Sequence, residues 1–184
     1  MNFIITDKTY PQSIENEVNK ALSFYPELHA TPIDFKFKSK IEKSTMQAQP
    51  KFHTLFLPRS KRSYNIYIRN TFKLNSRELP ILDIPKDVLV GWFGHELGHI
   101  MDYENMGNAS LIKFGLAYFF SNKAVVRAER RADSFAVKHG MLPYLEKTKA
   151  FLLDHADIPE VYKLRLKALY PSTEELANMV NDFP

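Results

Sequence analysis

The residues best able to do chemistry in this chain form the segment His95-Glu96-Leu97-Gly98-His99, an H-E-x-x-H pattern. Four residues advance an α-helix by about 400° and 6 Å, so the two imidazoles lie on one face about a turn apart, as two ligands of one tetrahedral metal ion require. Glu96 lies about 100° around the helix, where its carboxylate addresses a metal-bound water. The spacing predicts a zinc site with Glu96 as general base, because zinc lowers the pKa of bound water to about 7.

The H-E-x-x-H pattern is rare by chance, and the composition of the chain limits which ligands a metal site could use. With average residue usage, fewer than about one random chain in a hundred of this length would contain this pattern. The preceding run 88–93 is apolar, so the helix is expected to be buried, where neighbouring histidines need polar partners. The chain has 0 Cys, which excludes disulfide frameworks, thiolate zinc fingers and cysteine nucleophiles. Any metal site must therefore use His and carboxylates.

A third ligand is expected from a second predicted helix, where Glu129 and Asp133 are four residues apart. Acidic pairs at this spacing usually belong to a solvated helix surface. This pair is a candidate for the site only because the chain also contains the H-E-x-x-H pattern. We assign Glu129 to the metal together with His95 and His99, and we expect Asp133 to accept the free N–H of a ligating imidazole. Two imidazoles and one carboxylate favour one Zn²⁺ per chain, although other divalent ions bind such ligands.

These motifs resemble those of the gluzincin zinc peptidases, most closely the HtpX-like family that includes the CAAX prenyl endopeptidases. That family follows H-E-x-x-H with Glu-x-x-Ala-Asp and a small and aromatic run, as in residues Glu129 to Ala136. The segment Tyr170 to Leu176 is similar to the family's late His-Pro-x-x-Glu-Glu-Arg, with Tyr170 and Leu176 replacing its His and Arg. The resemblance covers about Val88 to Leu176. It implies a zincin-like metallopeptidase domain, here without the family's hydrophobic membrane spans.

Gluzincins also place a His, Tyr or Arg beside the developing oxyanion, and the sequence does not choose among several candidates. The candidates for oxyanion or substrate contacts are His139, His155, Tyr170 and Tyr103. Isolated histidines are more often structural or surface residues, and this interpretation also applies to His29 and His53. Asp102 could orient an imidazole or serve a helix surface or cap. Basic residues near the second motif could solvate a helix face or hold a substrate carboxylate; these are Arg127, Arg130 and Arg131.

The elements that position the site are predicted in two groups, strands first and helices second, which indicates an α+β fold. The first group has a helix over about Pro11 to Phe24, then alternating strands within Ile33 to Asn70. We expect Phe52 to Leu57 to be the edge strand that pairs with an extended substrate, because Pro58 suits an edge. The helical group begins with a helix over about Pro85 to Met106. Further helix signals are stops at Gly107 and Gly140, starts at Pro143 and Pro159, and a capping box from Ser172 to Glu175.

The apolar segment Leu111 to Phe120 lies between the two motifs. It is well short of the roughly 20 residues that span a bilayer. We expect a core helix packed under the site, with contact to a membrane surface as the alternative.

Composition sets the class of the protein. Its 184 residues are 45% hydrophobic and 25% charged, which suits a single domain over residues 1–184. The formal net charge of +4 is spread along the chain, so nucleic acid is not an expected partner. Residues 1–7 lack the cationic region of a signal peptide, and we expect a cytoplasmic protein.

The sequence therefore predicts a zinc-dependent peptidase acting on a peptide or protein substrate. The alternative is a non-catalytic metal-binding or regulatory protein on the same scaffold, which the replacements at Tyr170 and Leu176 leave open. A third hypothesis, a membrane-associated interaction protein that uses Leu111 to Phe120, requires no metal.

Overall fold

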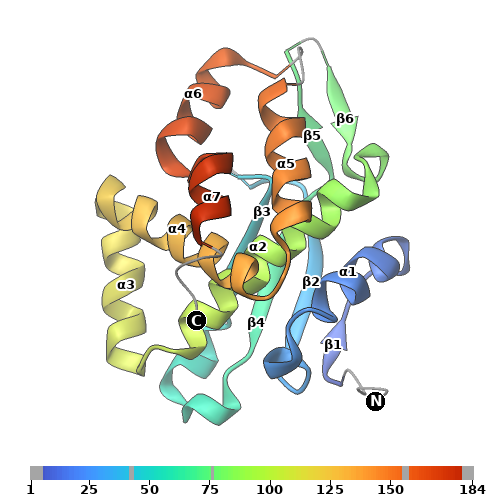
Figure 1. Ribbon diagram of the computed structural model, residues 1–184. Helices are drawn as coiled ribbons and strands as arrows, with labels where there is room; N and C mark the ends of the chain where they lie inside the picture. Colours follow the sequence, from blue (N-terminus) through green and yellow to red (C-terminus); the bar gives the residue numbers. More distant parts are fainter. Residues whose placement is uncertain (1–5, 42–43, 76, 155–157, 180–184) are drawn as a thin grey trace.

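The structure is a computed structural model that describes residues 6–41, 44–75, 77–154 and 158–179. It has the expected α+β class, with a small sheet formed by the first part of the chain and a mostly helical second part (Figure 1). The strands are β1 (Lys8–Thr9), β2 (Ile33–Lys38), β3 (Met46–Pro50), β4 (Tyr64–Arg69), β5 (Thr71–Lys73) and β6 (Glu78–Pro80). The α-helices are α1 (Glu15–Leu22), α2 (Lys86–Glu104), α3 (Asn108–Phe120), α4 (Asn122–Lys138), α5 (Leu142–Asp154), α6 (Glu160–Leu169) and α7 (Thr173–Met179). The short 3-10 helices are η1 (Gln12–Ile14), η2 (Pro26–Leu28), η3 (Phe52–Phe56), η4 (Arg59–Lys61) and η5 (Ile81–Asp83).

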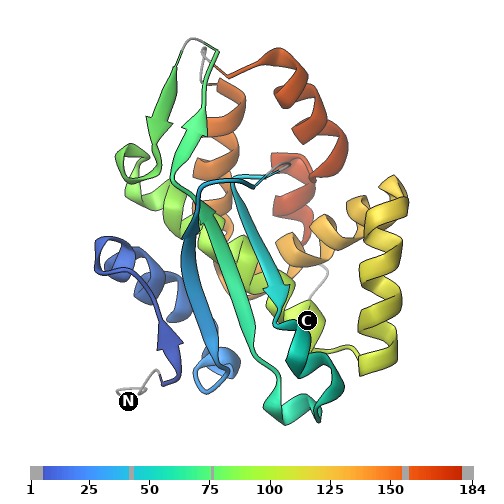
Figure 2. The same ribbon diagram turned by 180° about the vertical axis from the view of Figure 1, so that it is seen from behind.

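The main sheet has the strand order β1-β2-β4-β3, and a separate hairpin joins β5 and β6. Strands β1, β2 and β4 are parallel, whereas β3 runs antiparallel to β4 at the edge. The predicted alternation of β2 and β4 is confirmed, since Phe35, Ile66 and Ile68 are buried on the inner face. Figure 2 shows the opposite face of the sheet, which none of the described helices covers. The polar residues between the buried ones occupy that face.

The predicted strand over Phe52 to Leu57 is wrong, because this segment contains the 3-10 helix η3. Phe52 and Phe56 are largely exposed and contact each other, so they do not alternate across a sheet. The edge strand is instead β3, in which Met46 and Ala48 are buried. Its Ala, Gln and Pro residues have low strand propensity, and pairing with β4 determines its conformation.

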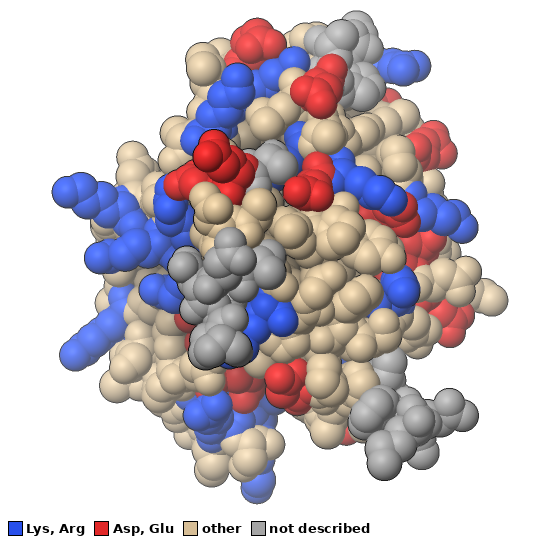
Figure 3. All heavy atoms as spheres, in the orientation of Figure 1, with Lys and Arg blue, Asp and Glu red and all other residues tan. Residues whose placement is uncertain are grey.

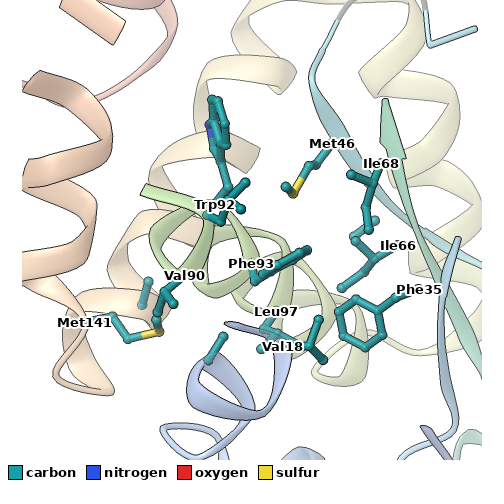
Figure 4. Close-up of a cluster of buried hydrophobic side chains, with 14 of the residues drawn as sticks. Val18, Phe35, Met46, Ile66, Ile68, Val90, Trp92, Phe93, Leu97 and Met141 are labelled. Carbon is teal, nitrogen blue, oxygen red and sulfur yellow. The ribbon is translucent and has the colours of Figure 1, made fainter. Parts of the chain in front are cut away.

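The helix α2 forms the middle of the structure and lies within two residues of its predicted bounds. It packs against the sheet and α1 on one side and against α4 and α5 on the other (Figure 1). In the close-up of Figure 4, Phe93 points toward Phe35 and Ile66, and Val90 lies beside Met141. One cluster of buried side chains thus includes residues of both the sheet and the helices. A helix buried on all sides must satisfy its polar residues internally, as the site does.

The later helices follow the predicted signals. Gly140, which follows the C-cap residue His139 of α4, adopts a φ of 79°, a conformation that costs glycine little and ends a helix. The capping box at α7 is confirmed, since the Glu175 N–H donates to Ser172 Oγ at 3.1 Å and the Ser172 N–H to Glu175 Oε2 at 2.7 Å. Pro159 precedes α6 as its N-cap, and Pro143 lies in the first turn of α5. No helix among the described residues is long and apolar enough to cross a membrane.

The expectation that Leu111 to Phe120 forms a core helix is wrong in one respect. The segment is helical, as α3, but Leu111 is its only buried residue. Phe114 and Tyr118 are partly buried toward the protein, and Phe119 and Phe120 are exposed. An apolar composition is typical of a core helix, but here α2, α4 and α5 already fill the space around the site. The helix α3 therefore lies at the side of the molecule, in contact with α4 and η3 (Figure 1).

Candidate metal centre

The site forms where α2 and α4 pack closely. The helix α2 supplies His95, Glu96 and His99, and α4 supplies Glu129 and Asp133. Gly98, inside the H-E-x-x-H pattern, permits this approach, because a Cβ there would lie only 2.3 Å from the backbone oxygen of Ala132 on α4. A side chain at this position would hold the two helices apart. Glycine at this position therefore allows α4, which carries Glu129 and Asp133, to pack closely against α2, which carries the H-E-x-x-H pattern.

Three donor groups converge in this interface. His95, His99 and Glu129 each offer a ligand atom, and these atoms all lie within 4.8 Å of one another. Glu129 Oε2 lies 3.0 Å from His95 Nε2 and 3.6 Å from His99 Nε2. Ligands held about 2.1 Å from a tetrahedral ion are separated by roughly 3.4 Å, a value between these two distances. This buried group could therefore hold a metal ion.

Asp133 makes the contact expected of it. Its Oδ1 lies 2.8 Å from His95 Nδ1, and because an ionised carboxylate only accepts, this nitrogen carries the proton. With the proton on Nδ1, Nε2 of His95 keeps the lone pair that could bind a metal ion, and it lies 3.0 Å from Glu129 Oε2. Lys149 of α5, which the sequence analysis missed, approaches Asp133 Oδ2 at 3.6 Å and also donates to the Pro171 carbonyl. His99 Nδ1, in contrast, is buried without a hydrogen-bond partner among the described residues.

The electrostatics of the site favour a bound cation. The acidic residues Glu96, Glu129 and Asp133 are 6%, 4% and 1% exposed. Burial raises the pKa of Glu96. At Glu129, burial is outweighed by the neighbouring histidines, and the pKa of that carboxyl is lowered well below its usual range. At His95, burial is likewise outweighed by the neighbouring carboxylates of Asp133 and Glu129, so its pKa is raised. Buried carboxylates gathered around two imidazoles are stabilised by positive charge placed among them.

Glu96 points toward the edge of the sheet. Its Oε2 accepts a hydrogen bond of 2.6 Å from the backbone N–H of Ala48 in β3. The carbonyl of Ala48 accepts a longer hydrogen bond of 3.4 Å from the Tyr103 hydroxyl. The ring of Tyr103 in turn stacks on His99, with centroids 6.1 Å apart. The β3 backbone thus borders the site beside Glu96, the place that the sequence analysis assigned to Phe52 to Leu57.

Two further tyrosines reach the donor group. The Tyr118 hydroxyl of α3 donates to Glu129 Oε1 at 3.0 Å. The sequence analysis missed this residue, although its spacing from Leu111 and Phe114 places it on the inward side of α3. Tyr170 precedes α7, and its ring centroid lies 5.5 Å from that of His95. Burial, followed by the charge of Glu129, raises the pKa of Tyr170 well above its usual range, so it stays protonated.

The remaining candidates lie elsewhere. His139 stacks on Tyr25 at 4.5 Å, and its ring nitrogens lie 2.7 Å from the Phe135 carbonyl oxygen and 3.2 Å from a Glu27 carboxylate oxygen, so its role is structural. His155 lies outside the described residues. Two ion pairs lie at the site's margin: Arg131 with Asp102 at 2.9 Å, and Arg130 with Glu175 at 2.7 Å.

Asp102 therefore joins α2 to α4 through Arg131, and neither interpretation made from the sequence describes this role. Leu176, at the position where the resembling family has Arg, is fully buried in the core. That position therefore provides no basic side chain to the site.

Comparisons with protein-family models, with curated proteins and with solved structures find no match to this chain. The interpretation of the site therefore depends on its own residues and their geometry.

Proposed function

We propose that the protein is a zinc-dependent peptidase with a gluzincin-type site. One observation carries this proposal: two imidazoles and one carboxylate converge in a buried group, while a second carboxylate lies beside them at a sheet edge. A purely structural cluster has no need of that second buried carboxylate, which costs free energy to desolvate.

Each residue of the group has a role in the proposal. His95, His99 and Glu129 would hold the ion, and Asp133 would keep His95 in the required tautomer. When bound, zinc would polarise a peptide carbonyl and make water a strong nucleophile at neutral pH. Zinc is favoured over Mg²⁺ or Ca²⁺ because those ions prefer all-oxygen ligand sets.

Glu96 would move the proton. Its Oε2 is fixed by the Ala48 N–H, which orients the carboxylate and leaves Oε1 to take a proton from the attacking water. Burial raises the pKa of this carboxyl, and a stronger base results. The same carboxylate would then deliver the proton to the leaving amine. Tyr170, whose protonated phenol ring lies beside the His95 ring, is the candidate donor to the developing oxyanion.

The substrate would be an extended peptide. The strand β3 is an edge strand that pairs with β4 alone among the described residues. Its Ala48 N–H and C=O groups face Glu96 and Tyr103, on the side away from β4. A peptide along this edge would lie beside Glu96, and its main chain would replace the Tyr103 hydroxyl at the Ala48 carbonyl, whatever its side chains.

The test is proteolysis of a broad peptide library by the full chain, as purified, after treatment with a chelator, and after zinc is restored. We expect cleavage that the chelator abolishes and zinc restores. His95→Ala and His99→Ala should lose stoichiometric zinc. A chain that holds zinc but cleaves no peptide would favour the alternative, a non-catalytic metal-binding or regulatory protein. Tight zinc retention by Glu129→Ala would move the third ligand elsewhere, first to Asp133.

A further inference from the structure

The outer side of α3 exposes a stripe of large apolar side chains. Leu116, Phe119 and Phe120 are 58%, 81% and 87% exposed, and Ile112 continues the stripe at 41%. Leu116, Phe119 and Phe120 follow Ile112 by four, seven and eight residues, so all four side chains lie on one side of the helix. The inward side is engaged, because Leu111 is buried and Tyr118 donates to Glu129. We call the four exposed residues the outer face of α3.

The outer face continues onto η3. The side chain of Asn108, at the start of α3, donates to the Leu57 carbonyl at 3.0 Å, and α3 contacts η3. Phe52 and Phe56 of η3 are also exposed, with ring centroids 5.6 Å apart. Exposed aromatic and aliphatic side chains gathered on two contacting elements mark an interaction surface, since single scattered apolar residues are the norm elsewhere.

The charge around this surface has one sign. The 24 residues from 105 to 128 include Lys113, Lys123 and Arg127 but no Asp or Glu. These three side chains are exposed, and none forms an ion pair within the described part of the chain. Figure 3, in the orientation of Figure 1, shows Lys and Arg side chains projecting from the left side of the molecule, where α3 and the start of α4 lie. The surface therefore suits a partner that is apolar with a negatively charged border.

A small hollow adjoins the exposed phenylalanines. It has a volume of about 390 Å³ and is lined by Asn122, Lys123, Val126 and Arg127, in the first turns of α4 directly after Phe120. The surface that lines it is mainly apolar. The hollow therefore extends the apolar surface, and Lys123 and Arg127 supply positive charge beside it.

We propose that α3 and η3 dock on the surface of an anionic lipid bilayer. The outer face would insert among the acyl chains, with Lys113, Lys123 and Arg127 at the lipid phosphates. A second copy of the chain suits the surface less well, because a symmetric contact would bring these cations together. The 13 residues of α3 extend about 20 Å, which is too short to span a bilayer but suits a helix lying in its interface. The proposal is independent of zinc and of peptidase activity.

The test is sedimentation of the full chain with vesicles of phosphatidylcholine alone and of phosphatidylcholine mixed with phosphatidylserine. We expect binding to the mixed vesicles that is at least about tenfold tighter than to the neutral ones, because each cation at an anionic surface accounts for about fivefold. Raising the salt from about 0.1 M to about 1 M should weaken this binding, since the Debye length falls from about 10 Å to about 3 Å.

Variants separate the apolar and the charged parts of the surface. Phe119→Ser with Phe120→Ser should weaken binding about 100-fold or more, because two inserted phenyl rings are lost. Lys123→Gln with Arg127→Gln should weaken binding to mixed vesicles about 25-fold. A matched control, Lys73→Gln with Arg77→Gln on the β5–β6 hairpin, removes the same charge and should bind as the native chain does.

A second control is Val161→Ser with Leu164→Ser, which removes exposed apolar side chains of α6 and should leave binding unchanged. Three results would overturn the proposal. They are no sedimentation with mixed vesicles, equal binding by the Phe119 and Phe120 variant, and a native dimer that this variant dissociates in sedimentation velocity. Salt-sensitive binding to polyglutamate without vesicle binding would likewise replace the bilayer with an acidic protein.

Discussion

Gly98→Ala should separate the two halves of the metal centre. The new Cβ would lie 2.3 Å from the Ala132 backbone oxygen, about 1 Å short of the 3.4 Å at which ordinary contacts begin. A backbone oxygen cannot rotate away as a flexible side chain can, so α4 must move by about 1 Å. Glu129 is three residues from Ala132 and moves with it. Metal sites tolerate ligand displacements of only about 0.2 Å, so we expect zinc affinity to fall at least about 100-fold.

Stability should change much less than zinc binding. Overpacking costs about 1–3 kcal/mol, and the better helix propensity of Ala offsets about 1 kcal/mol of it. The free energy of unfolding without metal should therefore fall by no more than about 2 kcal/mol. Gly94→Ala is the matched control on the same helix, because its Cβ would meet the flexible end of Met141. Gly115→Ala, with no atom within 4 Å, controls for helix propensity alone.

The assay is competition for zinc against a chromophoric chelator, with circular dichroism to show that each variant is folded. Gly94→Ala and Gly115→Ala should bind zinc as the native chain does. A Gly98→Ala protein that binds zinc within about threefold of native would refute the reasoning, because the helices would then have another way to accommodate the methyl group.

Three further substitutions each test one set of contacts, two at the metal centre and one in β2. Asp133→Asn should fold and bind zinc about 10- to 100-fold more weakly by the same competition assay, since His95 loses a charged acceptor. Tyr118→Phe removes the 3.0 Å hydrogen bond to Glu129 Oε1 and should cost about 1 kcal/mol of zinc binding free energy; unchanged affinity would contradict this role. Asp34 has its pKa lowered to about 2, because hydrogen bonds from two lysines and a threonine outweigh its burial. Its contribution to stability, about 1 kcal/mol after screening, is present above about pH 4 and lost as the pH falls through about 2. Urea unfolding of Asp34→Asn should show a smaller loss over that range than the native chain shows.

The central helix and the donor group were predictable because each depends on spacing within a single helix. A four-residue separation fixes which side chains share a face, whatever the rest of the fold does. His95 and His99 could therefore be paired from the sequence, and the same rule paired Glu129 with Asp133. Bringing the two pairs together needed a tertiary contact that spacing does not encode. Gly98 permits that contact, since its approach to Ala132 leaves no room for a side chain, but only the structure shows this role.

The edge strand and the exposed helix were not predictable for a different reason. Ala48 and its neighbours form a strand because β4 pairs with them, and a chain of such composition has no strand preference of its own. The residues of α3 are apolar both toward the protein and toward solvent, so periodicity could not show that its outer side is unpaired. The sequence shows that the segment Leu111 to Phe120 is apolar, but it does not show which residues the segment contacts.

The most direct test of the proposed peptidase compares Glu96→Gln with the native chain at matched zinc occupancy. Glutamine has nearly the same size as glutamate but cannot take a proton at neutral pH. Glu96 is outside the proposed ligand set, so the variant should fold and hold zinc as the native chain does. We expect kcat/KM on any peptide cleaved by the native chain to fall by about 10²- to 10⁴-fold. A variant that keeps zinc and retains more than about a tenth of native activity would contradict the role of Glu96 as general base.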